Sequence, residues 1–168
     1  MNHSSLFSIR FSRAAVEQHP TLTGLDFSRD PRRAHHGGGM SADDVELLMQ
    51  VLPNTNVESI NLAFNRIGDE GASTIAGALR KTKLKSLDLE TAGINAAGTA
   101  AVAAVLAKDD SDVHSINFSH NNIGGAVDSL IEAAKKHSKL KHVGDEGTVV
   151  GGSRLLSPPR QLKFYCPC

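Results

Sequence analysis

Several classes of protein are excluded by what this sequence of 168 residues has little of. It contains no tryptophan, only 4% aromatic residues, and 18 Lys and Arg against 18 Asp and Glu. Binding to phosphate backbones in general requires an excess of positive charge, so the balanced charge argues against a nucleic-acid partner. Because the two cysteines are Cys166 and Cys168, no disulfide can cross-link the body of the chain and no cysteine cluster can hold a structural zinc there. The length fits one small domain held together by packing.

No stretch is apolar enough to predict a membrane span. The longest run without a charged residue, residues 91–107, has 17 residues and consists largely of Ala, Gly, Thr and Asn. A helix that spans a bilayer needs about 20 predominantly apolar residues. With so few aromatic residues, the core has to be filled by Leu, Ile, Val and Ala.

What the sequence does contain is an internal repeat. The segment VESINLAFN, which begins at Val57, recurs with the same apolar spacing from Leu84 and from Val113, at offsets of 27 (57 to 84) and 29 residues (84 to 113). An earlier copy begins at Leu22, 35 residues before Val57. The excess falls in residues 31–39, which we interpret as a loop insertion.

Each unit changes its hydrophobic period part-way. Apolar residues first alternate, as Ile60 and Leu62 do, which predicts a strand, and then recur every three or four residues, which predicts a helix. Ser41, followed by two aspartates, is typical of a helix start. Because one unit cannot bury both its strand face and its helix stripe, the units must stack. The helical stripes contain Val45, Leu48, Met49 and Leu52; Ile75, Ala76, Ala78 and Leu79; Ala101, Val102, Val105 and Leu106; and Leu130, Ile131 and Ala134.

The pattern resembles that of leucine-rich repeat proteins over roughly Leu22 to Lys139, and its period resembles the ribonuclease-inhibitor-like subclass, as in NOD-like receptors and the Ran GTPase-activating protein. The resemblance implies an α/β fold: a short solenoid of four repeats plus a degenerate fifth, with a parallel concave sheet and outer α-helices. It also implies that Asn65 and Asn121 are structural and bond backbone groups of the turn after each strand. Ala92 interrupts this pattern, so we expect its turn to be less well satisfied.

The strand residues that alternate with the buried ones form the expected partner surface, because successive strand side chains face opposite sides. Asp88 and Glu90 are its strongest charged pair, and Phe64 and Arg66 are its best anchors. The pattern fits either a site for a protein with basic or amide groups or an ordinary solvated sheet face. The candidate partner-binding residues are Asp26, Ser59, Asn61, Phe64, Ser86, Asp88, Glu90, Ser115, Asn117 and His120, and the same alternation adds Ala63 and Ser119.

The sequence offers no catalytic, metal or cofactor motif. No serine lies in a G-x-S-x-G setting, and Asp88 and Glu90 lie on an exposed strand instead of a pocket that could separate their pKa values. His35 and His36 are adjacent in a Gly-rich segment, without the spacing or the nearby acid or cysteine of a metal site. Residues 37–39 are not followed by the Lys and Ser or Thr of a phosphate-binding loop. We therefore predict no enzyme activity, no metal and no cofactor.

The two ends follow other patterns. Residues 1–21 are predicted to form a capping helix or a targeting segment, because residues 1–16 are Ser-rich, contain two arginines and lack acids. Residues 148–168 are expected to form a flexible basic tail. Its last residues, Cys166 to Cys168, resemble the doubly prenylated end of Rab GTPases, but the chain lacks their G domain, so we do not expect lipidation.

Taken together, the sequence predicts a leucine-rich-repeat domain over residues 22–147 that binds another protein through its concave sheet. We expect a cytoplasmic protein, with targeting to an organelle through residues 1–16 as the alternative. Two other functions stay open. One is a GTPase-activating protein acting in trans on a small GTPase, which follows from the resemblance to the Ran activator. The other is a truncated fragment of a longer repeat receptor.

Overall fold

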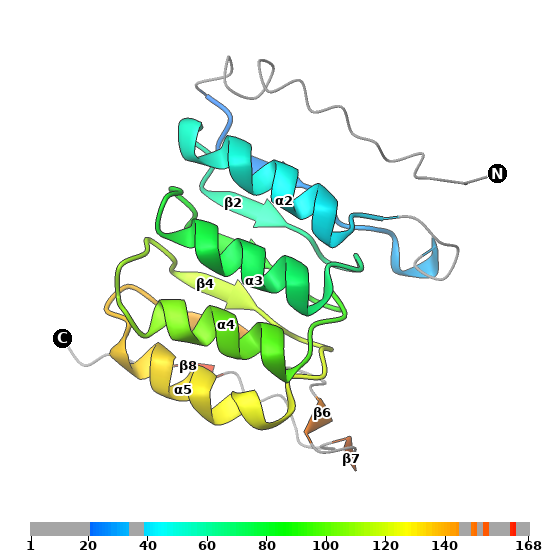
Figure 1. Cartoon of the computed structure of the whole chain (residues 1–168), viewed down its shortest axis with the longest axis vertical. Coiled ribbons are helices and arrows are strands. Elements are labelled where there is room, and N and C mark those ends of the chain that lie inside the picture. Colours follow the sequence, from blue (N-terminus) through cyan, green and yellow to red (C-terminus); the bar gives the residue numbers. More distant parts are fainter. Residues whose placement is uncertain (1–20, 34–38, 145–148, 151–152, 155–161, 164–168) are drawn as a thin grey trace.

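Strands and helices alternate along the chain and stack unit upon unit in the computed structural model (Figure 1). The structure describes residues 21–33, 39–144, 149–150, 153–154 and 162–163. The units contain β1 (Gly24–Asp26), η1 (Pro31–Arg33), α2 (Ala42–Val51), η2 (Leu52–Asn54), β2 (Ser59–Asn61), α3 (Gly68–Leu79), β3 (Ser86–Asp88), α4 (Ala96–Leu106), β4 (Ser115–Asn117), η3 (Gly124–Ala126), α5 (Val127–Lys136) and β5 (His142–Gly144).

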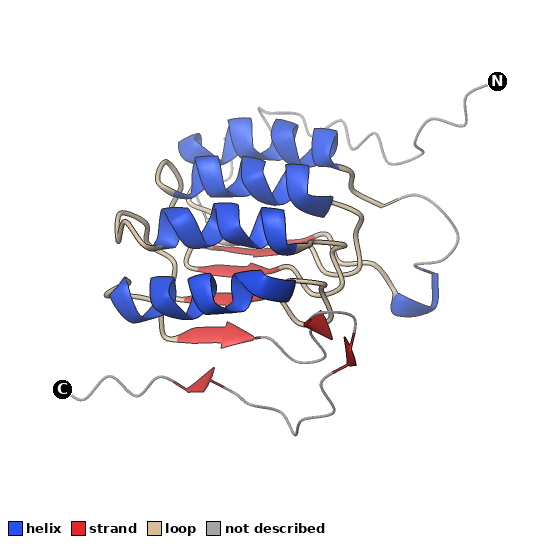
Figure 2. Ribbon diagram, turned by 60° about the horizontal axis from the view of Figure 1, so that its bottom comes forward, coloured by secondary structure: helices blue, strands red, loops and turns tan. Residues whose placement is uncertain are grey.

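Strands β1 to β5 form a parallel sheet in which each strand pairs with the strand of the unit before it. Equivalent residues of the repeats are partners: Ile60 lies opposite Leu87, and Leu87 lies opposite Ile116. Leu25 lies opposite Ile60, so β1 keeps the register of the repeats although its unit is longer than the others. The helices cover one face of the sheet, and we call the other face the open face (Figure 2). The predicted α/β solenoid is confirmed.

A thin layer of aliphatic side chains fills the space between the sheet and the helices. The strand residues Ile60, Leu87 and Ile116 are at most 2% exposed, and the helices add residues such as Ile75 at 0%. Phe118, also 0% exposed, is the largest fully buried side chain. Branched aliphatic residues pack such a layer densely, which explains why few aromatic residues suffice.

The first unit is less enclosed than the following ones. Leu25 and Phe27 are only partly buried, although the equivalent residues Ile60 and Leu62 are in the core. An end unit has a neighbouring repeat on one side only. The predicted capping helix or targeting segment, residues 1–21, lies outside the described residues apart from Thr21.

Two helices begin with side-chain caps of different origin. Ser41 caps α2 as predicted: its hydroxyl accepts the N–H of Asp44 (3.3 Å), and the Asp44 carboxylate accepts the N–H of Ser41 (2.9 Å). Helix α4 is capped by Asp69, a residue of α3, whose Oδ1 accepts the N–H groups of Asn95 (2.7 Å) and Gly98 (3.0 Å). One carboxylate thus lies in the first turn of its own helix and satisfies free N–H groups of the next.

The substitution Asp69→Ala is expected to lower the free energy of unfolding by about 1 kcal/mol, because two N–H groups at the start of α4 lose their acceptor. Urea unfolding followed by circular dichroism measures the change. Glu70→Ala is the matched control, since Glu70 lies in the same turn of α3 and is exposed. Equal effects of the two substitutions would show that the cap across units contributes nothing.

The C-terminal part contains strands that the repeat pattern does not reveal. Strand β5 is the predicted start of the fifth unit, with Val143 opposite Ile116. Beyond it, β8 (Leu162–Lys163) pairs antiparallel with β5, and β6 (Val149–Val150) pairs with β7 (Ser153–Arg154). A sheet edge offers free backbone groups to any extended segment, whatever its side-chain pattern. This accounts for β8, whereas β6 and β7 form a separate pair, and all described residues of the predicted flexible tail lie in these short strands.

Candidate functional site

The register of the sheet brings most of the candidate partner-binding residues together on the open face. Asp26, Asn61, Asp88 and Asn117 are successive partners across β1 to β4 and form one row. Ser59, Ser86 and Ser115 form a second row beside it. The side chains of the two rows are exposed or half-buried, so they are accessible to a partner.

The row of Asp and Asn residues also has a structural role that the sequence analysis did not identify. In each case Oδ1 accepts the N–H two residues later: Ser28 donates to Asp26 (2.8 Å) and Ala63 to Asn61 (3.0 Å). Glu90 donates to Asp88 (3.0 Å), and Ser119 donates to Asn117 (2.9 Å). These turns end each strand after three residues and hold the side chains in fixed positions. The signal in the sequence is an Asp or Asn at the fifth position of each of the first four units.

Hydrogen bonds also keep the first member of this row ionised. Those from the Ser28 hydroxyl and N–H lower the pKa of Asp26 below its ordinary value. A carboxylate that accepts such bonds stays charged at neutral pH. The row therefore carries fixed negative charge at Asp26 and Asp88 and neutral amides at Asn61 and Asn117.

The strongest charge on the open face lies at Asp88 and Glu90. The Asn117 amide donates to Asp88 Oδ1 (3.1 Å) and reaches Glu90 Oε2 at 3.5 Å, so one amide orients both half-buried carboxylates. Within the described ranges, neither carboxylate has an ion pair with Lys, Arg or His.

Several acids elsewhere on the molecule pair with a cation. Arg80 lies 2.8 Å from Asp110, and Lys85 lies 2.6 Å from Glu58 in the preceding unit. Asp112 pairs with Lys139. These pairs are about half exposed, and exposed pairs contribute at most about 1 kcal/mol each to stability. These ion pairs involve none of the residues in the two rows on the open face.

Phe64 and His120 lie at the rim of the open face in an uncommon backbone conformation. The φ angles of Phe64, Thr91 and His120 are 60°, 49° and 58°, in the left-handed region that residues other than glycine rarely adopt. The three positions are equivalent in consecutive units. The N–H of Phe64 donates to Glu90 O (2.8 Å) and that of Thr91 to Ser119 O (3.0 Å), so bonds to the next unit hold this conformation. Phe64 is half-buried, whereas His120 and Arg66 are exposed.

Two residues that the strand alternation assigns to the partner surface are buried. Ala63 is 4% exposed and Ser119 is 7% exposed. Both lie two positions after the end of a three-residue strand, whereas the longer side chain of Glu90 at the equivalent position of the third unit is half-buried. These two residues do not belong to the accessible open face.

Asn65 and Asn121 lie beneath the rim and link neighbouring units. The Asn65 amide donates to Leu62 O (3.0 Å) in its own unit and to Phe27 O (2.9 Å) in the preceding one, while its Oδ1 accepts the N–H of Met40 (2.8 Å). Both asparagines are almost fully buried, at 2% and 3% exposed. Their amides replace water for backbone groups that the turns leave unpaired.

The turn around Ala92 is satisfied by the following unit. Asn121 Oδ1 accepts the N–H groups of Ala92 (3.1 Å) and Ile94 (3.0 Å), and the Asn121 amide donates to Leu89 O (2.7 Å). The expectation of a poorly satisfied turn at Ala92 is therefore wrong. The asparagine of one unit thus bonds the turn of the unit before it. An asparagine at position 92, which is equivalent to Asn121, would therefore bond the turn at residues 65–67.

Comparison with known proteins supports this unit-by-unit construction. The family model described as Leucine Rich repeat matches residues 54–76, which span β2 and most of α3. A solved chain described as leiomodin-1 actin-binding site 2 superposes with a TM-score of 0.63 and 21% sequence identity, over 83% of this chain and 80% of that chain. This chain folds as a leucine-rich repeat solenoid. The C-terminal domain of tropomodulin from Caenorhabditis elegans is similar as well, with a TM-score of 0.62 and 16% sequence identity. The match covers 79% of this chain and 78% of the tropomodulin chain. No curated protein matches the sequence significantly.

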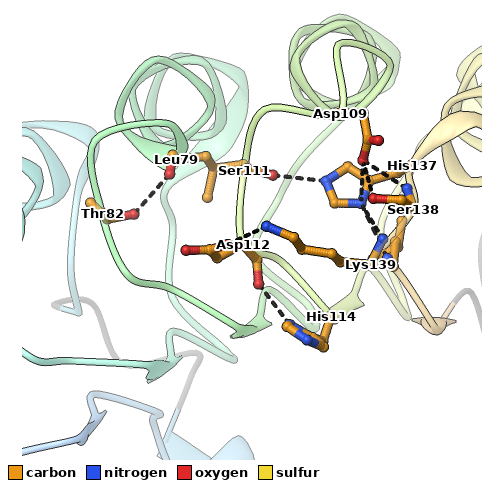
Figure 3. Close-up of polar contacts among 10 residues, drawn as sticks. Leu79, Thr82, Asp109, Ser111, Asp112, His114, His137, Ser138 and Lys139 are labelled. Atoms are coloured by element: carbon orange, nitrogen blue, oxygen red, sulfur yellow. Dashed lines mark hydrogen bonds and ion pairs between the residues drawn. The ribbon is translucent and has the colours of Figure 1, made fainter.

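The solenoid also contains a Ser, His and Asp cluster that the sequence analysis missed (Figure 3). His137 Nε2 lies 3.0 Å from Ser111 Oγ, and His137 Nδ1 lies 3.5 Å from Asp109 Oδ1. In a catalytic triad Nδ1 carries the proton and Nε2 receives the proton of the serine. Here Nδ1 accepts the N–H of Leu140 (3.1 Å), so the proton is on Nε2 and is donated to Ser111. Ser111 is 4% exposed, so the cluster has neither the tautomer nor the access that hydrolysis requires.

Metal and membrane sites were also considered. Among the described residues, no three His, Cys, Asp or Glu side chains are grouped so that they could hold a metal ion. His35, His36, Cys166 and Cys168 lie outside those residues. In the part of the chain that the structure describes, no helix has the length and apolar character needed to cross a bilayer.

Proposed function

We propose that the solenoid is a protein-interaction module without catalytic activity, and that its open face, the concave side of the sheet, binds the partner. The observation that carries this proposal is the pair Asp88 and Glu90. Asn117 orients both carboxylates, and no described cation pairs with either. Like charges held together cost free energy unless a partner supplies the opposite charge. The function predicted from the repeats thus gains a defined acidic centre.

The chemistry of this face defines the kind of partner. A Lys or Arg side chain would pair with Asp88 and Glu90, and amide groups would bond Asn61 and the serine row. Phe64 at the rim supplies an apolar contact beside the charged centre. The leiomodin-1 chain is described as an actin-binding site, which makes actin the first partner to test.

The test is a binding titration of the full chain against actin, with the double variant D88N/E90Q. Both substitutions remove a charge and keep an oxygen acceptor, so the turn at Asp88 is preserved. We expect the dissociation constant to rise at least tenfold, or about 1.4 kcal/mol, because the partner's cation loses its counter-charge. Glu132→Gln, on the exposed side of α5, is the control and should leave the affinity unchanged.

Two outcomes contradict the proposal in different ways. If the unmodified chain does not bind actin, actin is not the partner. If D88N/E90Q binds as tightly as the unmodified chain, the open face is not the binding surface. A loss of affinity in Glu132→Gln instead would place the partner on the helices.

The subclass and the compartment are also proposals. The helices of 10 to 12 residues in α2, α3, α4 and α5 support the ribonuclease-inhibitor-like subclass, in which a full α-helix follows each strand. We retain the cytoplasm as the compartment. GTPase activation and the longer receptor depend on the sequence resemblance alone, and we do not adopt them.

A further inference from the structure

His137 joins neighbouring units of the solenoid through hydrogen bonds, and the two that it accepts at Nδ1 can be made only by its neutral form. Its ring is 0% exposed and lies between the loop after α4 and the loop before β5 (Figure 3). Nδ1 accepts the N–H groups of Leu140 (3.1 Å) and Lys139 (3.3 Å), while Nε2 donates to Ser111 Oγ (3.0 Å). A second proton would have to occupy Nδ1, where it would face two N–H donors.

The charged and titratable groups around the ring come from both loops and from the start of β4. Asp109 and Asp110 lie in the preceding unit, His114 comes directly before β4, and Lys139 lies on the loop after His137. Burial lowers the pKa of His137 below the ordinary 6.5; Asp109 and Asp110 oppose this, whereas Lys139 and His114 add to it. The carboxylate oxygen of Asp109 nearest to the ring, Oδ1, already accepts the N–H (2.7 Å) and the hydroxyl (2.9 Å) of Ser138.

The ring also fixes the segment that leads into β5. Directly after Leu140, the N–H groups of Lys141 (2.8 Å) and His142 (3.1 Å) donate to His114 O. At the other end of β5, Gly144 O accepts the N–H of Phe118 (2.8 Å). Loss of the bonds at Nδ1 would therefore loosen the segment that carries β5.

We propose that His137 is a pH-sensitive latch, and that its protonation in mild acid releases residues 137–144 from the fourth unit. Because the folded solenoid favours neutral His137, the latch contributes its full stability above about pH 6.5. The contribution is lost as the pH falls from there through the lower pKa of the folded state. This inference does not depend on the proposed function of the open face.

Amide hydrogen exchange of the full chain at pH 7.5 and pH 5.5 tests the proposal, after correction for the intrinsic effect of pH on exchange. The N–H groups of His142 and Phe118 should lose severalfold, and at most about tenfold, of their protection at pH 5.5, which is the limit for one histidine with an unfolded pKa near 6.5. The N–H of Leu62, directly after β2, should keep its protection. In His137→Asn the loss should vanish, since the carbonyl oxygen of Asn can accept the same N–H groups and does not titrate. The control His120→Asn, at an exposed position, should retain the loss.

A measurement on the unmodified chain covers the case in which His137→Asn does not fold. Nitrogen chemical shifts of the His137 ring should show the proton on Nε2 at pH 7.5, and the ring should titrate below pH 6.5. A proton on Nδ1, titration at or above pH 6.5, or an equal loss of protection in His137→Asn would each overturn the latch.

Discussion

Replacing Asn121 with alanine is expected to lower the free energy of unfolding by about 3 kcal/mol, the largest effect that we predict for a single substitution. The Asn121 amide donates to Leu89 O (2.7 Å) and Phe118 O (3.0 Å), and its Oδ1 accepts two N–H groups of the preceding unit. Alanine would leave these backbone groups buried without a partner, and each such group costs about 1 kcal/mol or more. It would also leave a cavity where the amide was.

Urea unfolding of Asn121→Ala, followed by circular dichroism, measures this loss. Asn122→Ala is the matched control: Asn122 is exposed, and its amide reaches Asn95 only at 3.4 Å. We expect the control to stay within about 0.5 kcal/mol of the unmodified chain. A loss below about 1 kcal/mol for Asn121→Ala would show that water replaces the amide in the turn, and the link between the third and fourth units would then be weak.

The stacking of the units could be predicted because the recurrence of buried apolar strand residues determines it. Ile60, Leu87 and Ile116 recur at the repeat offset, and burying all of them on one side requires that they lie opposite one another. The capping role of Ser41 was predictable for a similar reason, since the cap and its partner Asp44 are three residues apart. Interactions between residues that are close in the sequence can be recognised from a local sequence pattern.

Interactions between units leave no such pattern. Asp69 resembles any acid in a first helical turn, and only the packing of α3 against α4 places it at the N–H of Asn95, 26 residues later. His137 has the same distance of 26 residues to Ser111, and no motif marks it. Alternation also misplaced Ala63 and Ser119, which are buried although Glu90 at the equivalent position of the third unit is half-buried.

The candidate partner surface was predictable in part. The rows through Asp88 and Asn117 follow from the register of the strands, which the repeat determines. That one amide orients both Asp88 and Glu90 does not follow from the repeat, because it depends on the rotamer of Asn117. Whether an acid lacks a cation likewise depends on the loops: Glu58 has Lys85 within reach, whereas Asp88 has no described cation beside it.

Replacing Gly98 with alanine is expected to destabilise the solenoid by about 2 kcal/mol, although alanine is the better helix former. A Cβ atom at Gly98 would lie 2.8 Å from Asp69 Cα and 3.0 Å from Ala72 Cβ, both in α3. The nearest of these is a backbone atom, so α3 and α4 would have to move apart. That movement would also lengthen the bonds from Asp69 Oδ1 to the start of α4, which lie at 2.7 and 3.0 Å.

Gly77→Ala provides a control with the opposite sign. Gly77 is in α3, is exposed, and a Cβ built there meets no atom within 4 Å. With no contact to disturb, alanine should stabilise the helix by about 0.5–1 kcal/mol, because it loses less backbone freedom on folding than glycine. Thermal and urea unfolding of the two variants should therefore move in opposite directions. If both variants were stabilised, the helices would not be as closely packed as the structure places them, and the cap from Asp69 to α4 would lose its geometric basis.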